Sequence, residues 1–528
     1  MNYDVFIPTA GLGTRLNVLS QNINKSLLPI NHKPVISHII EKFPTAKVFH
    51  IALGFKGNLV KDYLKITYPK KKFNFIKIKN FQGKGSGLGL TLINSIDHIN
   101  RPFYFVSCDT FIDKKIDFNN FDWLAFSKKK DFGQNYRHLR LKKNKVLKIL
   151  EKKERKIRGD KIYVGLAFIK NFKTFKIKLR ENKIKTQENG EVAVFNDMIK
   201  DNFEFKPIEI NWHDTGNLSL YLKLKKNKDK LKVNILQKTN EQIWFVNKKV
   251  IKFSQDQNFI KSRVVRANNL KNYVPKIINF TKNYYSYKFL EGKVFSDVKK
   301  LSKFKDLLNI SKKFWKIKKL NSQKNKKFIK SCQIFYKNKT LKRIDQFYRL
   351  TNIKEQNFII NNKKFEKLSS YIKKIKWNEL SKGISSRFHG DYHFENIIFN
   401  EKKNKFTFLD WRQDFNGIIT YGDLYYDLGK LMHGIIVSHE NVNRNKFKIL
   451  IDGKKIKLSI SRKKHLVKFE KYFIEWIKKN NFSLKKVYLI TSLIYLNIAP
   501  LHHDPYNKFL YFFGIYMLRK SLEIKNDT

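Results

Sequence analysis

The segment from residue 388 to residue 410, FHGDYHFENIIFNEKKNKFTFLD, gathers polar side chains that could act on a hydroxyl group. A His-Gly-Asp triplet ends at Asp391, Asn396 follows five residues later, and Asp410 ends an alternating apolar stretch. A carboxylate can accept the proton of an attacking hydroxyl, and amide and carboxylate oxygens are ligands that Mg²⁺ accepts. The spacing therefore predicts a base beside two oxygen ligands for a cation.

This order and spacing resemble the protein-kinase catalytic loop, H-x-D-x-x-x-x-N, and the HGD-x-x-x-x-N loop of the aminoglycoside phosphotransferase and choline kinase superfamily. The resemblance implies that Asp391 is the catalytic base. It implies that Asn396 and Asp410 hold Mg²⁺ against the phosphates of ATP. Trp411 and Arg412 follow the metal aspartate, and we expect them to line the acceptor pocket.

A second block, YGDLYYDLGKL from Tyr421 to Leu431, resembles the G-D-x-x-Y-D-L-A segment of the same family. We expect Asp423 and Asp427 to brace the catalytic loop and its helix rather than contact substrate. A solvated loop rich in His, Asp and Asn is the alternative. It does not explain why separate blocks agree in order and spacing.

Residues 241–254, EQIWFVNKKVIKFS, predict two strands joined by a tight turn at Asn247 and Lys248. Lys252 lies on the second strand and resembles the kinase lysine that pairs with ATP phosphates. A solvent-facing strand lysine is the alternative. No glutamate stands between Lys252 and Leu290 to pair with this lysine. A kinase-like half that does not catalyse therefore remains open.

The N-terminal segment YDVFIPTAGLGTRL predicts a strand that leads into a glycine loop. Gly11 and Gly13 would let backbone N–H groups approach a phosphate, and Thr14 and Arg15 follow directly. The third glycine of a dinucleotide fingerprint and the G-K-[ST] of a Walker A loop are both absent. The loop therefore predicts phosphate binding of another kind.

Lys25 follows Arg15 by ten residues, in the segment NKSLLPINHKPVISHII. Together the two segments resemble the sugar-phosphate nucleotidylyltransferases, whose signature is G-x-G-[TS]-R followed by P-K-x-L-[LV]-P; Asn24 stands where Pro is usual. The resemblance implies a Rossmann-like α/β sheet and a loop that binds NTP phosphates. It assigns Arg15 and Lys25 to charge stabilisation on the transferred nucleotidyl group.

Further blocks of that family follow in order. Gly85, Ser86 and Gly87 resemble its base-contacting loop, Asp109 ends the apolar strand FYFVSCDT, and NWHDTGN supplies Asp214. The resemblance implies that Asp109 and Asp214 hold Mg²⁺. Either aspartate alone could be a strand-end cap.

Two more positions resemble substrate contacts of the family. Lys152, in ILEKKER, matches a lysine that contacts the substrate phosphate, although Lys153 replaces the usual proline. Gly165, in YVGLAFI, matches a substrate-lining strand. A purely structural role remains an alternative for both.

The length of 528 residues predicts at least two domains. The expected fold class is α/β: a Rossmann-like nucleotidyltransferase domain over residues 1–228, followed by a bilobal, protein-kinase-like α+β domain over residues 232–528. The resemblance divides the second domain into an N-lobe at about 232–290 and a C-lobe at about 291–528.

The formal net charge of +66 would ordinarily indicate nucleic acid or an anionic membrane as a partner. The lysines are spread along the whole chain, and abundant Lys, Asn, Ile, Phe and Tyr indicate the drift of an AT-rich genome. We therefore expect no specific nucleic acid, although a nucleic-acid binder stays an alternative. The charge would still attract nucleotides and phosphorylated substrates.

The sequence shows neither a disulfide framework nor a signal peptide. Two cysteines and an N-terminus that leads straight into a strand predict a cytoplasmic protein. The longest apolar run, residues 487–500, is too short to cross a bilayer and predicts a buried helix.

Together, these resemblances imply a bifunctional enzyme that uses ATP, a second NTP and Mg²⁺. One half would phosphorylate a small hydroxyl acceptor. The other would transfer a nucleotidyl group to the resulting phosphate, giving an activated precursor for capsule or lipopolysaccharide synthesis. A sugar is the first choice of acceptor, because the first-half blocks resemble sugar-1-phosphate enzymes. Choline or another amino alcohol, giving a CDP-alcohol, is the alternative.

Overall fold

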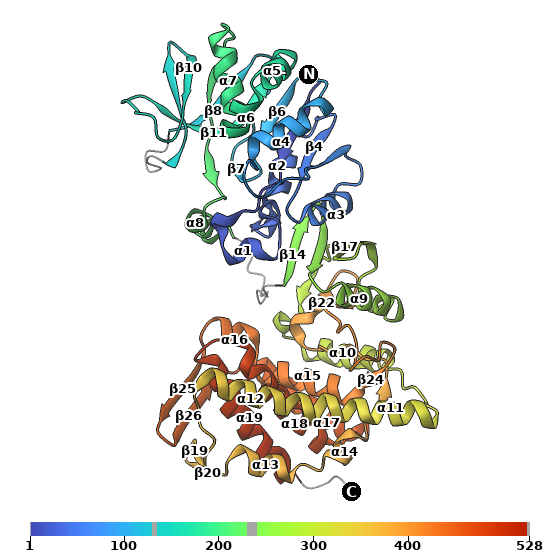
Figure 1. The fold of residues 1–528 in the computed structure, drawn as a ribbon. Coiled ribbons are helices and arrows are strands. Elements are labelled where there is room, and N and C mark those ends of the chain that lie inside the picture. Colours follow the sequence, from blue (N-terminus) through green and yellow to red (C-terminus); the bar gives the residue numbers. More distant parts are fainter. Residues whose placement is uncertain (1, 129–134, 230–239, 525–528) are drawn as a thin grey trace. The chain divides into compact units, whose positions relative to one another are not determined.

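The computed structural model describes residues 2–128, 135–229 and 240–524, and the chain forms two compact units (Figure 1). The first unit comprises Met1–Gln257 and Ile278–Phe289, and the second comprises Asn258–Ile277 and Leu290–Thr528. The predicted domain boundary at 228–232 falls at residues 230–239, which lie outside the described residues. The predicted domain limits therefore stay a prediction.

The first unit is built on a nine-stranded sheet in the order β10-β9-β11-β6-β1-β4-β5, with β8 paired to β11 and β12. The strands β6, β1, β4 and β5 are adjacent in this order and parallel to one another. Strand β11 is antiparallel to β6. Their bounds are β1 Asp4–Pro8, β4 Phe49–Leu53, β5 Phe73–Lys77, β6 Phe103–Val106, β8 Trp123–Ser127, β9 His138–Lys142, β10 Lys145–Leu150, β11 Lys161–Ile169 and β12 Lys206–Glu209.

Helices cover both faces of this sheet. Along β1, Val5 and Ile7 enter one apolar core while Phe6 enters the other, because successive strand side chains point to opposite faces. The first core includes side chains of α2 (Val35–Lys42), α3 (Gly57–Thr67) and α8 (Leu218–Lys228). The second includes side chains of α4 (Leu88–Ser95), α5 (Phe172–Glu181) and α7 (Glu191–Lys200). This arrangement confirms the Rossmann-like α/β prediction.

A short ribbon lies beside the sheet and joins two of its loops. β7 (Thr110–Ile112) follows β6 and pairs antiparallel with β13 (Trp212–Asp214). The register places Thr110 opposite Asp214. The chain therefore brings Asp214 next to Asp109 from about a hundred residues away.

A second, smaller sheet has the order β14-β15-β17-β16. β14 (Glu241–Val246) and β15 (Lys249–Ser254) form the predicted hairpin, and β17 (Tyr284–Lys288) and β16 (Ile277–Phe280) complete the sheet. Asn247 and Lys248 have φ of 51° and 57°, the left-handed backbone that a two-residue type I′ turn requires.

The apolar face of this small sheet packs into the core of the first unit, which the sequence did not predict. Trp244 is fully buried, and its ring centroid lies 5.2 Å from that of Tyr63 on α3. The Tyr284 hydroxyl donates to the Leu59 carbonyl at 3.0 Å. The strands expected to form a kinase N-lobe therefore share a core with the nucleotidyltransferase-like sheet.

Replacing Trp244 with alanine should destabilise the nucleotidyltransferase-like sheet by about 3–5 kcal/mol, because it leaves a large cavity in a shared core. Chemical denaturation of the full chain, followed by loss of nucleotidyltransferase activity, would measure the effect. Phe280→Ala is the matched control: Phe280 lies on the same sheet, is 63% exposed, and should cost less than about 0.5 kcal/mol. Equal effects of the two substitutions would contradict the shared core.

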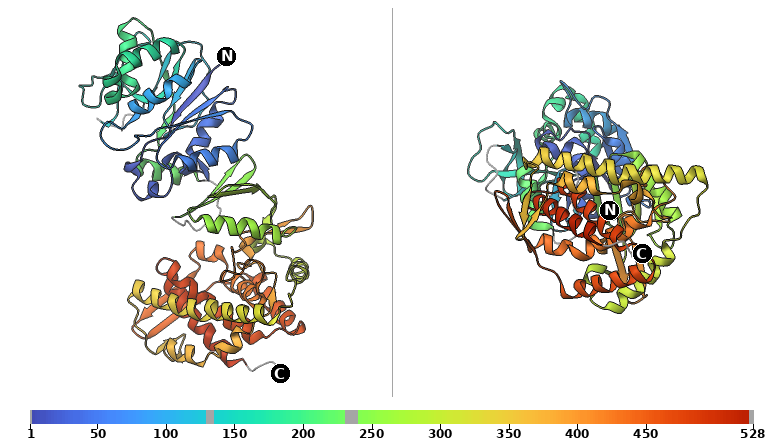
Figure 2. Two further views of the ribbon diagram at one scale, coloured as in Figure 1. Left: turned by 45° about the vertical axis from the view of Figure 1, so that its right-hand side comes forward. Right: turned by 90° about the horizontal axis from the view of Figure 1, so that it is seen from below.

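Most of the second unit is helical (Figures 1 and 2). The helix α18 lies between α15 and α19 and is buried along nearly its whole length, which confirms the prediction for residues 487–500. The principal helices are α9 Gln257–Asn269, α10 Leu301–Phe314, α11 Ser322–Gln333, α12 Lys339–Thr351, α15 Leu424–Ile436, α17 Lys464–Lys479, α18 Leu484–Ile498 and α19 Tyr506–Glu523. A π-helical turn, Ile334–Asn338, joins α11 to α12.

Two sets of strands interrupt these helices. The hairpin of β22 (Ile397–Asn400) and β23 (Lys405–Phe408) connects Asn396 to Asp410, as the alternating pattern predicted. A four-stranded sheet in the order β20-β19-β26-β25 was not predicted. Its bounds are β19 Phe358–Ile360, β20 Lys363–Phe365, β25 Phe447–Asp452 and β26 Lys455–Ile460.

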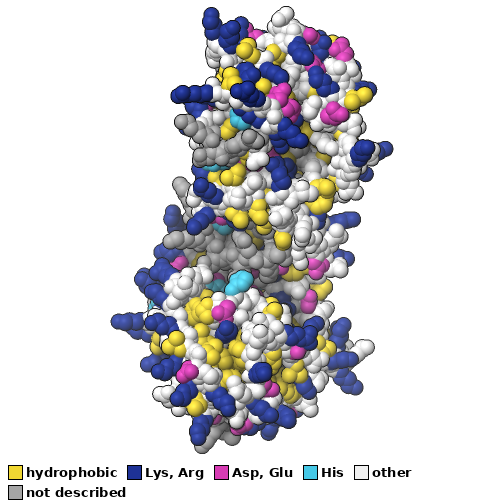
Figure 3. All heavy atoms as spheres, turned by 60° about the vertical axis from the view of Figure 1, so that its left-hand side comes forward, with side chains coloured by type: hydrophobic (Ala, Val, Ile, Leu, Met, Phe, Trp, Pro, Cys, Tyr) yellow, Lys and Arg dark blue, Asp and Glu magenta, His cyan; other side chains and the backbone are white. Residues whose placement is uncertain are grey.

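Lysine and arginine side chains are dispersed over the face drawn in Figure 3, among uncharged and hydrophobic ones. Within the described parts of the chain, no helix has the length and apolar character needed to cross a membrane.

Candidate active sites

Gly216, just after β13, marks the centre of a polar cluster in the first unit. A Cβ atom built there would lie 2.6 Å from Asp109 Oδ2, 3.1 Å from Asp214 Oδ1 and 3.2 Å from Arg15 Nη2. The Lys25 ammonium is 2.7 Å from Asp109 Oδ2. The structure thus brings together the four residues predicted for charge stabilisation and metal binding, around a position that tolerates only glycine.

Asn24, the departure from the usual signature proline, ties the loops of this site together. Its side chain is fully buried and donates to the carbonyls of Thr9 at 2.9 Å and Phe55 at 2.7 Å. Its oxygen accepts from the Ser26 amide and so caps the short turn that presents Lys25. The asparagine therefore links the end of β1 to the turn that carries the catalytic lysine candidate.

Gly165 acts on Asp109 through Ser107. The Ser107 amide donates to the Gly165 carbonyl at 2.7 Å, and a Cβ on Gly165 would lie 2.8 Å from Ser107 Cβ. The Ser107 hydroxyl in turn donates to Asp109 Oδ1 at 2.6 Å. This close approach explains the glycine structurally, and its predicted contact with substrate stays a prediction.

The pKa values of the two aspartates shift in opposite directions because their partners differ. Burial alone would raise the pKa of Asp109, but the adjacent Lys25 and the Ser107 hydroxyl lower it to about 2. Burial and the negative charge of Asp109 raise the pKa of Asp214. The Tyr136 hydroxyl donates to Asp214 Oδ2 at 2.6 Å, a contact that no sequence motif indicated. Two neighbouring carboxylates of this kind are a donor set that fits Mg²⁺.

Four more predicted residues of the first unit, Gly85, Ser86, Gly87 and Lys152, lie on loops. Gly85, Ser86 and Gly87 precede α4, and the Gly85 carbonyl accepts from the Gln187 side chain at 2.8 Å. The side chain of Lys152 is exposed, in the turn after β10. No described contact joins Lys152 to the cluster around Gly216. Its phosphate-binding role stays a prediction.

Replacing Gly216 with alanine should abolish most nucleotidyltransferase activity, because the new methyl group would displace Asp109 Oδ2 and crowd Arg15. We expect at least a 10-fold loss of kcat/KM, the order of effect seen when groups that orient metal ligands are disturbed. Pyrophosphate release measures it. The phosphotransferase activity of the same preparation is the internal control, and a variant as active as the parent would contradict the geometry.

In the second unit, Asp427 holds the loop that carries the predicted base. Its carboxylate accepts from the backbone amides of His389 at 2.6 Å and Gly390 at 2.7 Å, and from the Trp315 indole at 2.9 Å. Burial raises the pKa of Asp427 to about 6, although these donors oppose the shift. Asp423 caps the start of α15 by accepting from the Tyr425 amide. The predicted bracing role of both aspartates is confirmed.

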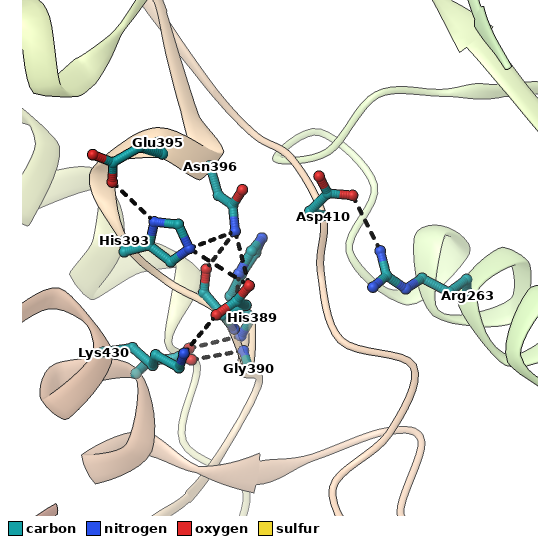
Figure 4. A network of polar contacts seen from close by, with 10 residues as sticks. Arg263, His389, Gly390, His393, Glu395, Asn396, Asp410 and Lys430 are labelled. Atoms are coloured by element: carbon teal, nitrogen blue, oxygen red, sulfur yellow. Dashed lines mark hydrogen bonds and ion pairs between the residues drawn. The ribbon is translucent and has the colours of Figure 1, made fainter. Parts of the chain in front are cut away.

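Asp391 and Asn396 are in direct contact. The Asn396 amide group donates to the backbone carbonyl of Asp391 at 2.9 Å and to its carboxylate at 3.1 Å. Figure 4 shows the Asn396 oxygen turned away from these bonds, on the side where Asp410 lies. The oxygens of Asn396 and Asp410 are hard donors that fit Mg²⁺.

The Asp391 carboxylate also forms an ion pair with Lys430 at 2.9 Å. Its side chain is 37% exposed, so a substrate hydroxyl can reach it. Partial burial alone would raise the pKa of Asp391, but Lys430 and His393 hold it well below its usual range. The group is therefore a carboxylate at neutral pH, as a base must be.

His393, Glu395 and His439 offer three ligand atoms within 4.8 Å of one another. Burial alone would lower the pKa of His393, but Asp391 and Glu395 raise it to about 9. The His393 ring lies 3.5 Å from the Asp391 carboxylate and 3.1 Å from the Glu395 carboxylate, so we interpret it as a cation that pairs with both.

The helix that lacks a glutamate, α9, carries arginines instead. Arg263 reaches Asp410 Oδ1 at 3.3 Å, and the Trp411 indole donates to the Arg263 carbonyl at 2.9 Å. Arg266 is 1% exposed and donates to the Arg412 carbonyl at 2.9 Å. The helix is thus fastened to the catalytic loop by positive charges. Asp410 has φ of +56°, a strained backbone of the kind found at functional sites.

The burial of Trp411 and Lys252 bears on the contacts predicted for them. Trp411 is 1% exposed and its indole hydrogen-bonds to α9, and its predicted place beside the acceptor pocket stays a prediction. Lys252 is 8% exposed, in register with Ile243 and Tyr285 in the small sheet of the first unit. That burial argues against a solvent-facing strand lysine. Its pairing with ATP stays a prediction.

Known proteins match the two parts of the chain separately. Residues 367–445 match the model of the Phosphotransferase enzyme family. In the first half, the "Bifunctional protein GlmU" of Methanococcus vannielii is 29% identical over 225 residues, 40% of this chain and 52% of that protein. The "D-glycero-alpha-D-manno-heptose 1-phosphate guanylyltransferase" of Campylobacter jejuni is 32% identical over 106 residues, 20% of this chain and 46% of that protein. The chain thus spans about half the length of these curated relatives.

Among solved structures, a UDP-glucose pyrophosphorylase complexed with UDP-glucose matches 43% of this chain and 98% of its own, at 18% identity and a TM-score of 0.38. A TM-score this low carries no argument about the fold. The relatives and the family model confirm both predicted resemblances. One region of the chain is similar to curated proteins that include a sugar-phosphate nucleotidyltransferase, and another matches the model of the Phosphotransferase enzyme family.

Proposed function

We propose that this protein phosphorylates a hydroxyl group of a small sugar with ATP and then joins the sugar phosphate to a nucleotide from an NTP. The convergence of Asp109, Asp214 and Arg15 on Gly216 carries the proposal for the first unit. The contact of Asp391 with Asn396 supports it for the second. Fusion of the two activities is sensible, because the product of one is the substrate of the other.

In the second unit, Asp391 accepts the proton of the attacking hydroxyl. Asp427 fixes the loop that carries it, and Lys430 holds the carboxylate ionised in one orientation. Asn396 and Asp410 would hold Mg²⁺ against the ATP phosphates. Such positioning and charge neutralisation account for most of phosphoryl-transfer catalysis.

In the first unit, Lys25 and Arg15 are placed to stabilise charge on the transferred nucleotidyl group while a sugar phosphate attacks the α-phosphorus and pyrophosphate leaves. Ser107 and Tyr136 orient the carboxylates of Asp109 and Asp214. These carboxylates would hold Mg²⁺, which when bound neutralises the reacting phosphates. We place the enzyme in the cytoplasm and its product in capsule or lipopolysaccharide synthesis.

A mass-spectrometric screen tests the proposal. The full chain, Mg²⁺, ATP and each of CTP, UTP, GTP and dTTP would be incubated with a panel of sugars and amino alcohols. A nucleotide sugar that requires both ATP and one other NTP is the expected product. A CDP-alcohol would instead support the amino-alcohol alternative. Pyrophosphate release from a preformed sugar phosphate alone would leave the second unit as a non-catalytic module.

A further inference from the structure

Four basic side chains gather beside Asp391 from three separate elements of the second unit. Lys339 and Arg343 are one turn apart on α12, Arg412 follows β23, and Lys430 lies on α15. Only Lys430 among them has Asp391 as an ion-pair partner. The charged groups of the other three, Lys339, Arg343 and Arg412, take no part in the interactions that hold the catalytic loop.

One contact joins this cluster to the catalytic loop, and two more join its members to a shared aromatic ring. A Cβ atom on Gly390 would lie 2.5 Å from Arg412 Cβ, so the stem of Arg412 packs directly on the residue before Asp391. The Lys339 ammonium and the Arg412 guanidinium lie 4.4 Å and 4.9 Å from the centroid of the same ring, Phe335. Arg412 thus contacts the catalytic loop directly, and Lys339 lies on the same aromatic ring as Arg412.

Three members of the cluster lack a paired carboxylate. Within the described parts of the chain, no carboxylate oxygen lies within 4.0 Å of the charged groups of Lys339, Arg343 or Arg412. Burial, together with Arg412, Lys430 and Arg343, lowers the pKa of Lys339 to about 7. Like charges held together away from water are unfavourable, and such arrangements concentrate at functional sites.

The position of the cluster favours the acceptor over the nucleotide. Figure 4 shows Lys430 approaching the catalytic loop from the side opposite to Asp410, the predicted ligand of the ATP-bound metal. Asp391 is paired with Lys430 and also acts electrostatically on Lys339. A substrate that brings its hydroxyl to Asp391 from this side would meet Lys339, Arg343 and Arg412.

We propose that the acceptor whose hydroxyl is deprotonated by Asp391 is an anionic sugar. Lys339, Arg343 and Arg412 bind its carboxylate or phosphate group. The inference rests on the proposed phosphotransferase function of the second unit and names the substrate class of that site. Guanidinium groups match carboxylate and phosphate oxygens in two-point contacts. A quaternary amine needs the opposite environment, an aromatic cage without competing cations, and here two cations already cover Phe335.

The test uses the full chain and sugar acceptors that share a ring but carry a neutral, a carboxylate or a phosphate substituent. Glucose, glucuronate and glucose 6-phosphate share one ring, and the corresponding galactose, mannose and N-acetylglucosamine sets and choline complete the panel. ATP consumption gives kcat/KM, and calorimetry without ATP gives binding. We expect an anionic member to exceed its neutral parent by at least about 10-fold in kcat/KM, the effect of one charged hydrogen bond. The carboxylate and phosphate members distinguish the two sources of charge.

Variants assign the effect to the cluster. Arg343→Gln and Lys339→Met should each raise the KM for the anionic sugar about 10- to 100-fold and leave the KM for ATP unchanged. Lys342→Met, an exposed lysine on the same helix, is the matched control and should change neither constant. A neutral sugar or choline used as well as every anionic sugar, or a rise in the KM for ATP alone, would overturn the proposal.

The calorimetric measurement of binding without ATP tests this inference independently of the proposed phosphotransferase function. Binding of an anionic sugar that is lost in Arg343→Gln and retained in Lys342→Met supports the acceptor class even if no phosphate is transferred. In that case the proposed phosphotransferase function fails while the anion site stands. Absence of any binding that depends on Arg343 across the panel overturns the inference, whatever the activity.

Discussion

Replacing Asp391 with asparagine should lower acceptor phosphorylation by about 10²- to 10⁴-fold, the contribution expected of a positioned general base. The asparagine keeps the size of the side chain and an oxygen that can accept from Asn396, but it cannot take the proton of the hydroxyl. The pKa of Asp391 lies well below its usual range, so the parent carboxylate is fully available at neutral pH.

The measurement is ATP consumption that depends on an acceptor, with nucleotidyl transfer to a preformed sugar phosphate as the internal control. The latter should be unchanged, because Asp391 belongs to the second unit and the transferase residues to the first. Lys430→Met is the graded comparison: it removes the ion pair at 2.9 Å but keeps the carboxylate, so its loss should be smaller. If Asp391→Asn leaves phosphorylation intact, the second unit does not work as a phosphotransferase of this type.

The residues that sequence alone could place are those whose relation is local or follows from strand order. Asp391 and Asn396 are five residues apart, and their contact follows from a single tight loop. Asp109 follows a central strand, and its meeting with Lys25 reflects the rule that sites form at the carboxyl ends of parallel strands. Their roles in binding metal and nucleotide stay predictions.

Contacts that the fold makes between distant segments left no such signal. The hydrogen bond from Tyr136 to Asp214 joins residues 78 positions apart, and tyrosine is common throughout the chain. The docking of Trp244 on Tyr63 was also invisible, because an apolar strand face has the same pattern whichever core it enters. Alternation identifies a buried face but not its partner.

The basic cluster shows how composition can hide a site. Lys339, Arg412 and Lys430 come from three segments of a chain with 110 lysines and arginines, so none is distinctive in the sequence. Only their packing around Phe335 and Gly390 separates them from the dispersed surface charge. For the same reason the overall charge of +66 does not itself identify a partner.

Replacing Asp109 with asparagine should lower nucleotidyl transfer by about 10²- to 10³-fold, the cost of removing one preorganised electrostatic group from such a site. The substitution removes a predicted ligand of Mg²⁺. It also leaves Lys25, whose pKa is raised by its pairing with Asp109 in spite of burial, without its carboxylate partner at 2.7 Å. Pyrophosphate release from an NTP and a sugar phosphate measures the loss.

Ser107→Ala is the matched control for that variant, because it removes the 2.6 Å hydrogen bond that orients Asp109 but keeps the carboxylate. Its loss should be about 10-fold, as for other groups that position a metal ligand. Raising the Mg²⁺ concentration should restore part of the activity of Ser107→Ala and little of Asp109→Asn, since only the first retains both oxygens. Full rescue of Asp109→Asn by Mg²⁺ would mean that Asp109 contributes only metal affinity, and it would contradict the expected loss of a preorganised catalytic group.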